Sequence, residues 1–127
     1  MDLKSYNSTS IAYVGDAVWS LKVREFLLLQ GYQRAGDLQR LSTYFVSAKS
    51  QRIIYEKLEQ QNFFTEEENY YFKRGRNAKS KTVPKNTDVI TYHYSTGFET
   101  LIGYLYFTNQ VERINEIFEK TKGMVKL

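Results

Sequence analysis

The 127-residue chain lacks several residue types and segments, and each absence excludes a class of protein. It has no cysteine, so it can form neither a disulfide nor a thiolate metal site. It has no apolar run near the roughly 18 residues that a membrane helix needs, so we expect no membrane partner. Its first residues, MDLKSY, lack the apolar core of a secretory signal. Together these absences predict a cytoplasmic protein.

Proline is also scarce, which favours long helices. The one proline, Pro84, lies in a basic segment, and no other proline interrupts the apolar periodicity. The spacing predicts helices over residues 8–30, from about 37, from 47, from 65 to about 75, over 88–108, and from a capping box at Asn109 and Glu112 to Gly123. Residues 77–87 are expected to form an irregular loop. The predicted fold class is all-α, with one domain.

Basic residues are concentrated in one segment of the chain. Six lysines and arginines and no acid lie between residues 73 and 85, whereas the rest of the chain has twelve basic and fourteen acidic residues. Such a patch favours a polyanionic partner, with nucleic acid first and an anionic membrane surface second. A solvated loop kept soluble by its lysines fits the charge equally well.

Two acids stand in apolar stripes of expected helices. At about 100° per residue, Asp16 shares a face with Trp19, and Glu99 shares a face with Ile102. An unpaired buried carboxylate is costly, so each acid must be paired, protonated or bound to a metal. Oxygen ligands would select a hard ion such as Mg²⁺ or Mn²⁺. A salt bridge or a hydrogen bond to one of the eleven tyrosines explains the pattern as well, so both interpretations stay open.

Four sequence blocks carry a resemblance to a known family. Residues 13–18 (YVGDAV) resemble the signature helix of the ribonuclease III family, and residues 98–103 (FETLIG) resemble its second acidic motif. Between them, residues 74–78 (RGRNA) and 82–88 (TVPKNTD) resemble the loop of the Mini-III branch of that family. The four blocks occur in the expected order, and the resemblance covers nearly the whole chain.

The resemblance implies a ribonuclease III catalytic domain over residues 1–127 without a separate double-stranded-RNA-binding domain. It implies a homodimer in which the signature helix helps to form the interface. The implied activity is a magnesium-dependent endoribonuclease that cuts double-stranded RNA, with Mn²⁺ as a substitute ion. The Mini-III branch is associated with maturation of the large-subunit (23S) ribosomal RNA precursor, and the involvement of a ribosomal protein stays open.

Asp16 and Glu99 match the family's two most critical carboxylates, so the resemblance implies that both are catalytic residues and metal ligands. The sequence departs from the family at two other positions, where Ala12 and Thr96 replace a glutamate and an aspartate. With two carboxylates per subunit at the matched positions, one magnesium ion with water in the vacant ligand positions fits at least as well as two ions. The number of ions stays open.

The basic segment is expected to replace the missing RNA-binding domain. Its cationic side chains would contact phosphates, and its asparagines would reach 2′-hydroxyls or minor-groove edges. The predicted RNA-binding residues are Arg74, Arg76, Asn77, Lys79, Lys81, Lys85 and Asn86. The only histidine, His93, precedes the second acidic motif; a general-base role stays open beside a position facing solvent or at the core edge.

Two other functions remain compatible with the sequence. The chain could be a catalytically weak or silent module that binds double-stranded RNA, because Ala12 and Thr96 are not carboxylates. It could also be a helical protein-interaction domain whose acids form buried salt bridges. The latter predicts neither metal dependence nor affinity for RNA.

Overall fold

The computed structural model describes residues 1–79 and 82–127, and their regular structure is helical. The elements in chain order are the 3₁₀ helix η1 (Leu3–Ser5) and the helices α1 (Ser8–Leu29), α2 (Ala35–Val46), α3 (Ala48–Gln60), α4 (Glu66–Arg76), α5 (Val89–Phe107) and α6 (Val111–Lys122). The all-α prediction is therefore confirmed. In the described part of the chain, no helix has both the length and the apolar character needed to cross a bilayer.

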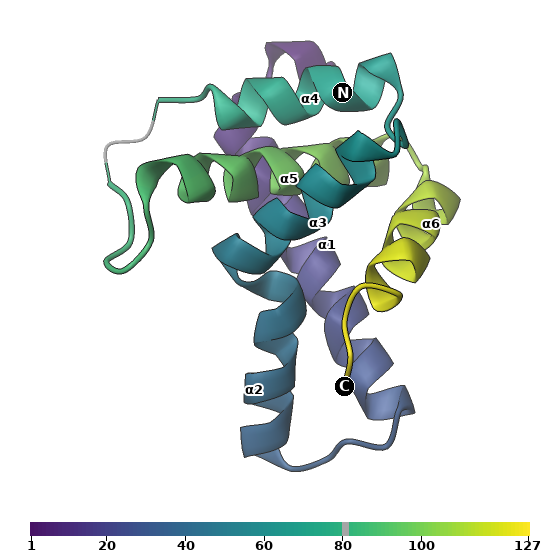
Figure 1. Cartoon of the computed structure of the whole chain (residues 1–127). Helices are drawn as coiled ribbons and strands as arrows, with labels where there is room; N and C mark the ends of the chain where they lie inside the picture. Colours follow the sequence, from purple (N-terminus) through teal and green to yellow (C-terminus); the bar gives the residue numbers. More distant parts are fainter. Residues whose placement is uncertain (80–81) are drawn as a thin grey trace.

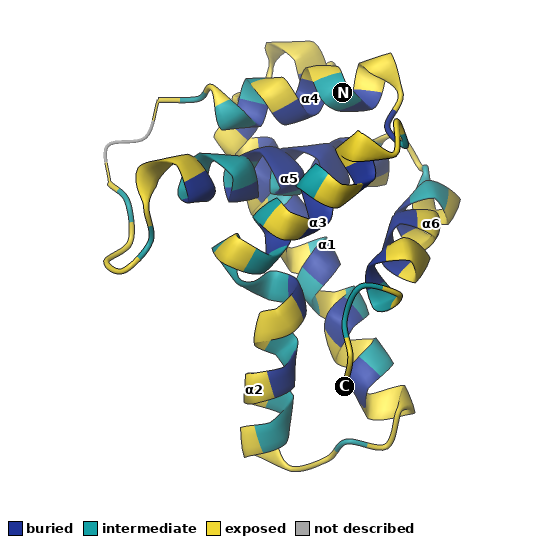
Figure 2. Ribbon diagram, viewed as in Figure 1, coloured by how far each residue is buried: buried dark blue, intermediate teal, exposed yellow. Residues whose placement is uncertain are grey.

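Helix α5 lies at the centre of the molecule, where α1, α3, α4 and α6 all contact it (Figure 1). Its middle is buried around its circumference (Figure 2), which agrees with its largely apolar sequence. Trp19 of α1 packs edge-on against Phe98 of α5, with ring centroids 4.9 Å apart. The Trp19 indole nitrogen also donates to the Phe45 carbonyl at 2.9 Å, so α1, α2 and α5 meet around one buried side chain.

The helix ends follow the sequence signals in some places and depart from them in others. The capping box at Thr65 is present, because Thr65 Oγ1 accepts from the Glu68 amide and Glu68 Oε1 accepts from the Thr65 amide. Helix α2 begins at Ala35, so Asp37 lies in its first turn and is not its N-cap.

The capping box predicted at Asn109 and Glu112 was wrong. Asn109 adopts a positive φ of 59°, and its amide donates to the Tyr106 carbonyl at 3.1 Å. This left-handed conformation, which asparagine tolerates, terminates α5. The N-cap of α6 is Gln110, which makes no side-chain capping hydrogen bond.

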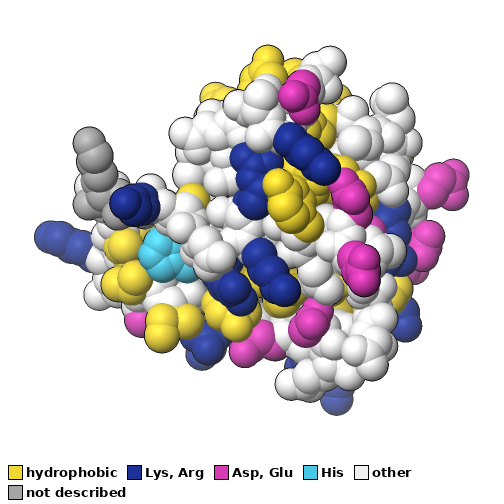
Figure 3. Space-filling model, turned by 90° about the horizontal axis from the view of Figure 1, so that it is seen from above, with side chains coloured by type: hydrophobic (Ala, Val, Ile, Leu, Met, Phe, Trp, Pro, Cys, Tyr) yellow, Lys and Arg dark blue, Asp and Glu magenta, His cyan; other side chains and the backbone are white. Residues whose placement is uncertain are grey.

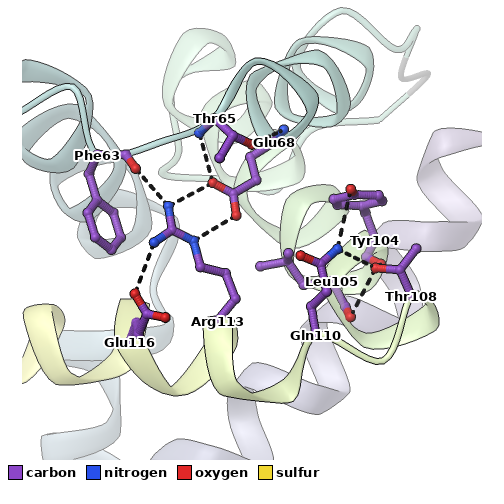
Figure 4. Close-up of polar contacts among 9 residues, drawn as sticks. All are labelled: Phe63, Thr65, Glu68, Tyr104, Leu105, Thr108, Gln110, Arg113 and Glu116. Carbon is purple, nitrogen blue, oxygen red and sulfur yellow. Dashed lines mark hydrogen bonds and ion pairs between the residues drawn. The ribbon is translucent and has the colours of Figure 1, made fainter.

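A buried ion pair fastens α6 to α4 (Figure 4). Arg113 donates to both carboxylate oxygens of Glu68, at 2.8 and 2.9 Å, and to the Phe63 carbonyl at 2.7 Å. Burial alone would raise the pKa of Glu68, but the hydrogen bonds from Arg113 and Thr65 outweigh it and hold that pKa below its ordinary value. Because both charges are satisfied, the pair can fix the placement of α6 without leaving an uncompensated charge in the interior.

Candidate active site

The candidate site forms where α1 packs against α5. Gly15 of α1 faces the backbone of α5, and a Cβ atom at this position would collide with the Glu99 carbonyl. Gly103 of α5 likewise faces the backbone of Ile11 in α1. Because neither glycine has a side chain, the two helix axes approach closely. This close approach brings Asp16, the residue after Gly15, beside Glu99.

Asp16 and Glu99 line the same cavity, whose volume is about 210 Å³. The cavity lies between the N-terminal half of α1 and the first three turns of α5. Its other lining residues are Thr9, Ala12, Tyr13, Ala78, Tyr92, His93 and Thr96. The structure thus brings together the two acids that the sequence motifs single out. Ala12 and Thr96, which replace the two further expected carboxylates, line the same cavity.

The two acids experience different surroundings. Burial is the largest of the effects that together raise the pKa of Glu99 to about 8; the nearby charge and hydrogen bonding of Asp16 act in the same direction, and the nearby Gln51 amide opposes them. Asp16 is exposed, and its Oδ1 accepts a long hydrogen bond of 3.5 Å from Ser20 Oγ. Glu99 therefore forms the inner part of the site and Asp16 its rim.

The exposure of Asp16 corrects the prediction that this acid lies in an apolar stripe. The buried face of α1 runs through Ile11, Gly15 and Trp19, which are spaced four residues apart. Asp16 follows Gly15 by one residue and is therefore rotated by about 100° from the centre of that face. Its carboxylate consequently reaches solvent at the cavity mouth, although Ala12 and Trp19, about one turn away, are buried.

The paired carboxylates fit a hard cation. Two like charges sharing a partly buried cavity repel each other, and a bound cation would relieve that repulsion. An all-oxygen pair matches the ligand preference of Mg²⁺. Within residues 1–79 and 82–127, no group of three or more histidine, cysteine, aspartate and glutamate side chains could hold a metal. Two carboxylates with water in the remaining positions is thus the ligand set that this chain offers.

Three further residues line the cavity; the sequence left the role of His93 open and gave none to Tyr92 or Ala78. His93 is half-buried and lines the cavity, so it lies closer to the acids than a solvent-facing histidine would. Tyr92 precedes Glu99 by seven residues, a helical spacing from which its place on the cavity wall follows. Ala78 comes from the segment between α4 and α5, and only the tertiary structure brings it to the site.

The predicted RNA-binding residues differ in their contacts and in their exposure. Arg74 donates to the carbonyls of Tyr6 and Leu3, at 2.6 and 3.3 Å, and so fastens η1 to α4. Arg76 donates to Asn77 Oδ1 at 3.2 Å. The side chains of Asn77, Lys79, Lys85 and Asn86 are exposed, and Lys81 lies outside the described residues. Since Ala78 lines the cavity, this basic segment borders the paired acids.

One lysine outside the basic segment, Lys4 of η1, lies beside the part of the segment that belongs to α4. The face of the molecule seen in Figure 3 carries lysine and arginine side chains interleaved with hydrophobic and acidic ones. Lys4 Nζ lies 5.6 Å from the centre of the Tyr70 ring, and the Arg74 guanidinium of the segment lies 5.9 Å from it. Lys4 therefore adds to the positive charge of the basic segment.

An all-helical core with paired carboxylates between two close-packed helices and a basic segment beside them defines a ribonuclease III-type domain. Residues 9–110 match the family model described as the ribonuclease III domain. The chain belongs to this family, and it is an endoribonuclease of the ribonuclease III type. The family acts on double-stranded RNA.

Relatives and a solved structure agree with this assignment. The chain is 45% identical over 116 residues to Mini-ribonuclease 3 of Enterococcus faecalis, which covers 91% of this chain and 88% of that protein. It is 43% identical over 118 residues to Mini-ribonuclease 3 of Staphylococcus aureus, covering 93% and 88% respectively. The crystal structure of a Fusobacterium nucleatum protein superposes with a TM-score of 0.85 at 32% identity and covers 98% of both chains. The predicted family is thereby confirmed.

Proposed function

We propose that this endoribonuclease cuts double-stranded RNA at the cavity between α1 and α5, with Mg²⁺ as its metal ion. The observation that carries the proposal is the placement of Asp16 and Glu99 around one cavity, close enough for Asp16 to raise the pKa of Glu99. Both acids are proposed to be catalytic residues and metal ligands. The products are expected to carry 5′-phosphate and 3′-hydroxyl ends.

We expect Glu99 and Asp16 to have different roles because they occupy different positions in the cavity. Glu99 and Asp16 would hold the ion, which when bound supplies charge neutralisation at phosphorus and an activated water. Glu99 is half-buried, so its carboxylate has a restricted position against α1. Asp16 stands at the open mouth, where an RNA phosphate arrives. Ala12 and Thr96 leave space in the wall that water can occupy.

The basic segment is proposed to hold the RNA duplex across this cavity. Cationic side chains would neutralise phosphates, and Asn77 and Asn86 would contact 2′-hydroxyls in the minor groove. Because Lys79 and Lys85 are exposed, we expect them to contact phosphates directly. Arg74, Arg76 and Lys81 complete the proposed set, with Arg74 also holding η1 in place.

We propose that the chain acts as a homodimer through the outer face of α1. This face exposes Tyr13, Leu21, Leu28 and Leu29, with exposed fractions from 57% to 84%. Apolar side chains gathered on one surface helix are typical of an interaction surface. Tyr13 also lines the cavity, so a second copy seated there would border the site. Two cavities in one dimer would serve the two strands of a duplex.

The specific RNA proposed is the 23S ribosomal RNA precursor. The similarity to Mini-ribonuclease 3 proteins supports this substrate, because the resemblance to the Mini-III branch implies it. A ribosomal protein that presents the duplex is an additional proposed partner. We place the reaction in the cytoplasm, in keeping with a chain without cysteine.

The test of the site is Asp16→Asn, which removes a charge and changes little volume. We expect cleavage of an RNA duplex with Mg²⁺ to fall at least about 100-fold, since the ion loses one of its two protein ligands. Binding of the duplex in chelator should stay within about twofold of the parent. Asp37→Asn on α2 is the matched control and should cleave normally. An Asp16→Asn protein that cuts at the parental rate would exclude this assignment.

A second candidate function is a double-stranded-RNA-binding module with little catalysis. It is favoured by Ala12 and Thr96, which leave two carboxylates in the cavity where the family resemblance implies four. The parent protein distinguishes the two functions when it is incubated with a ribosomal precursor duplex in Mg²⁺ and in chelator. Binding in both conditions without any cleavage would select the silent module.

A further inference from the structure

A fully buried side-chain amide lies near the candidate active site. Gln51, near the start of α3, has an exposed fraction of 0%. Its Oε1 accepts a hydrogen bond of 2.6 Å from Ser95 Oγ of α5, which is also buried. Its Nε2, by contrast, has no hydrogen-bond partner in the described part of the structure. A buried amide donor without an acceptor is unfavourable, so an acceptor for Nε2 is expected nearby.

The Glu99 carboxylate is the candidate acceptor. Ser95 lies one helical turn before Glu99, so its hydrogen bond holds the Gln51 amide next to the acid. The Gln51 amide also opposes the rise in the pKa of Glu99, which fits a donor directed at the carboxylate, and Nε2 is the only donor of the amide. The reversed amide would instead set its oxygen against the carboxylate oxygens. Geometry and chemistry therefore agree on one orientation.

We propose that Gln51 is a positioning residue whose Nε2 donates to the Glu99 carboxylate and keeps it turned toward Asp16. The proposal rests on the proposed function of the two acids. A hydrogen bond to one carboxylate oxygen of Glu99 would keep the other oxygen directed into the cavity. Neighbours that orient metal ligands in this way commonly change metal affinity or activity by about 10- to 100-fold. No sequence motif singles out Gln51, because its role depends on the packing of α3 against α5.

The first experiment replaces the amide with an apolar side chain of similar size, Gln51→Leu. We expect kcat to fall about 10- to 100-fold or the required Mg²⁺ concentration to rise by a similar factor, with KM for the RNA duplex unchanged within about twofold. Thr121→Val is the matched control, because Thr121 is also fully buried and its hydroxyl donates to the Ile117 carbonyl at 2.9 Å, on α6. This control should lose some stability and keep the parental Mg²⁺ requirement.

The second experiment does not depend on cleavage or on the folding of a Gln51 variant. The side-chain amide of Gln51 is followed by NMR in ¹⁵N-labelled parent protein while Mg²⁺ is added without RNA. We expect the Gln51 signal to move as Glu99 takes up the ion, and to stay in place in Glu99→Gln. A signal that Mg²⁺ leaves unmoved, over the range in which the parent cleaves, would overturn the proposal.

The variants separate this inference from the function on which it rests. If Asp16→Asn and Glu99→Gln are inactive while Gln51→Leu keeps the parental kcat and Mg²⁺ requirement, the positioning role is wrong and the site stands. If Asp16→Asn and Glu99→Gln both cleave normally, the site assignment itself is wrong. If cleavage falls in all three variants and a raised Mg²⁺ requirement is found only in Gln51→Leu, the results support both the site and the positioning role of Gln51.

Discussion

The fold strongly alters the ionisation of Glu99. Burial, reinforced by Asp16, moves its pKa from an ordinary 4.5 to about 8. Between these two pH values, the unfolded chain has released this proton while the folded protein still holds it. The contribution of Glu99 to the stability of the metal-free protein is therefore fully present below pH 4.5 and is lost as the pH rises through about 8.

This linkage predicts how Glu99→Gln changes stability with pH. A glutamine cannot ionise, so in chelator the variant should gain stability relative to the parent as the pH rises from 5 to 8.5. At about 1.4 kcal/mol per pKa unit the ceiling over this pH range is about 4 kcal/mol, and we expect about 2 kcal/mol because water enters the cavity. Urea unfolding at the two pH values measures it, with Glu112→Gln as the control for losing a carboxylate. An equal difference at both values would contradict the prediction.

At this same scale, sequence motifs predicted the pair Asp16 and Glu99 but not its surroundings. The motifs locate residues whose types the chemistry requires. They do not show that Asp16 is exposed, because the boundary of a buried helix face depends on how its neighbours pack. They also do not point to Gln51, which comes to the site from α3, and the block RGRNA does not show that its last residue, Ala78, reaches the cavity.

Among the elements, the pair α1 and α5 determines whether a site exists. The glycines at their contact, Gly15 and Gly103, set how closely the two helices approach. Any group inserted there must push α1 away from α5, and it would separate the two carboxylates as it did so.

We therefore expect Gly15→Ala to damage both folding and catalysis. The added methyl group collides with the Glu99 carbonyl, and overpacking of this kind costs about 1–3 kcal/mol. Cleavage should fall at least about tenfold at temperatures where the protein remains folded. Gly36→Ala is the matched control: Gly36 lies within α2 with no atom near the new methyl group, so a gain of about 0.5–1 kcal/mol is expected. Thermal unfolding and cleavage rates check both variants, and normal cleavage by Gly15→Ala would show that the helix spacing is not critical.

The helices themselves were largely predictable, because apolar residues recur at helical spacing over most of the chain. The predictions failed at helix ends whose positions depend on tertiary contacts or on the local backbone conformation. Asn109 resembles a capping residue in sequence, but its left-handed backbone closes the preceding helix. The short η1 was not predicted, since it is held by Arg74 from a distant helix.

At the scale of the whole molecule, the outer face of α1 predicts self-association. Leu28→Glu places a charge on this face, where the parent residue is 57% exposed in one chain. We expect the variant to have half the mass of the parent in solution, because a charge buried in the interface has no partner. Val111→Glu, at a comparably exposed apolar position on α6, should keep the parental mass. Light scattering after size exclusion measures both, and a monomeric parent would refute the dimer.

The basic segment predicts that the affinity for RNA depends strongly on salt concentration. Each phosphate contact adds roughly 0.7–0.9 to the slope of log affinity against log salt concentration. Lys79→Ala with Lys85→Ala should therefore reduce the slope by about 1.4–1.8 and weaken binding for every duplex sequence. Lys57→Ala, on α3, is the control and should leave the slope unchanged. An unaltered slope in the double variant would remove these two lysines from the RNA interface.

The two carboxylates come from segments near opposite ends of the chain, and only the docking of α5 onto α1 brings them together. During synthesis, Asp16 leaves the ribosome long before Glu99 has been added. An unfinished chain therefore holds only one of the two acids of the proposed site. The site is complete only after α5 has been translated and has docked onto α1.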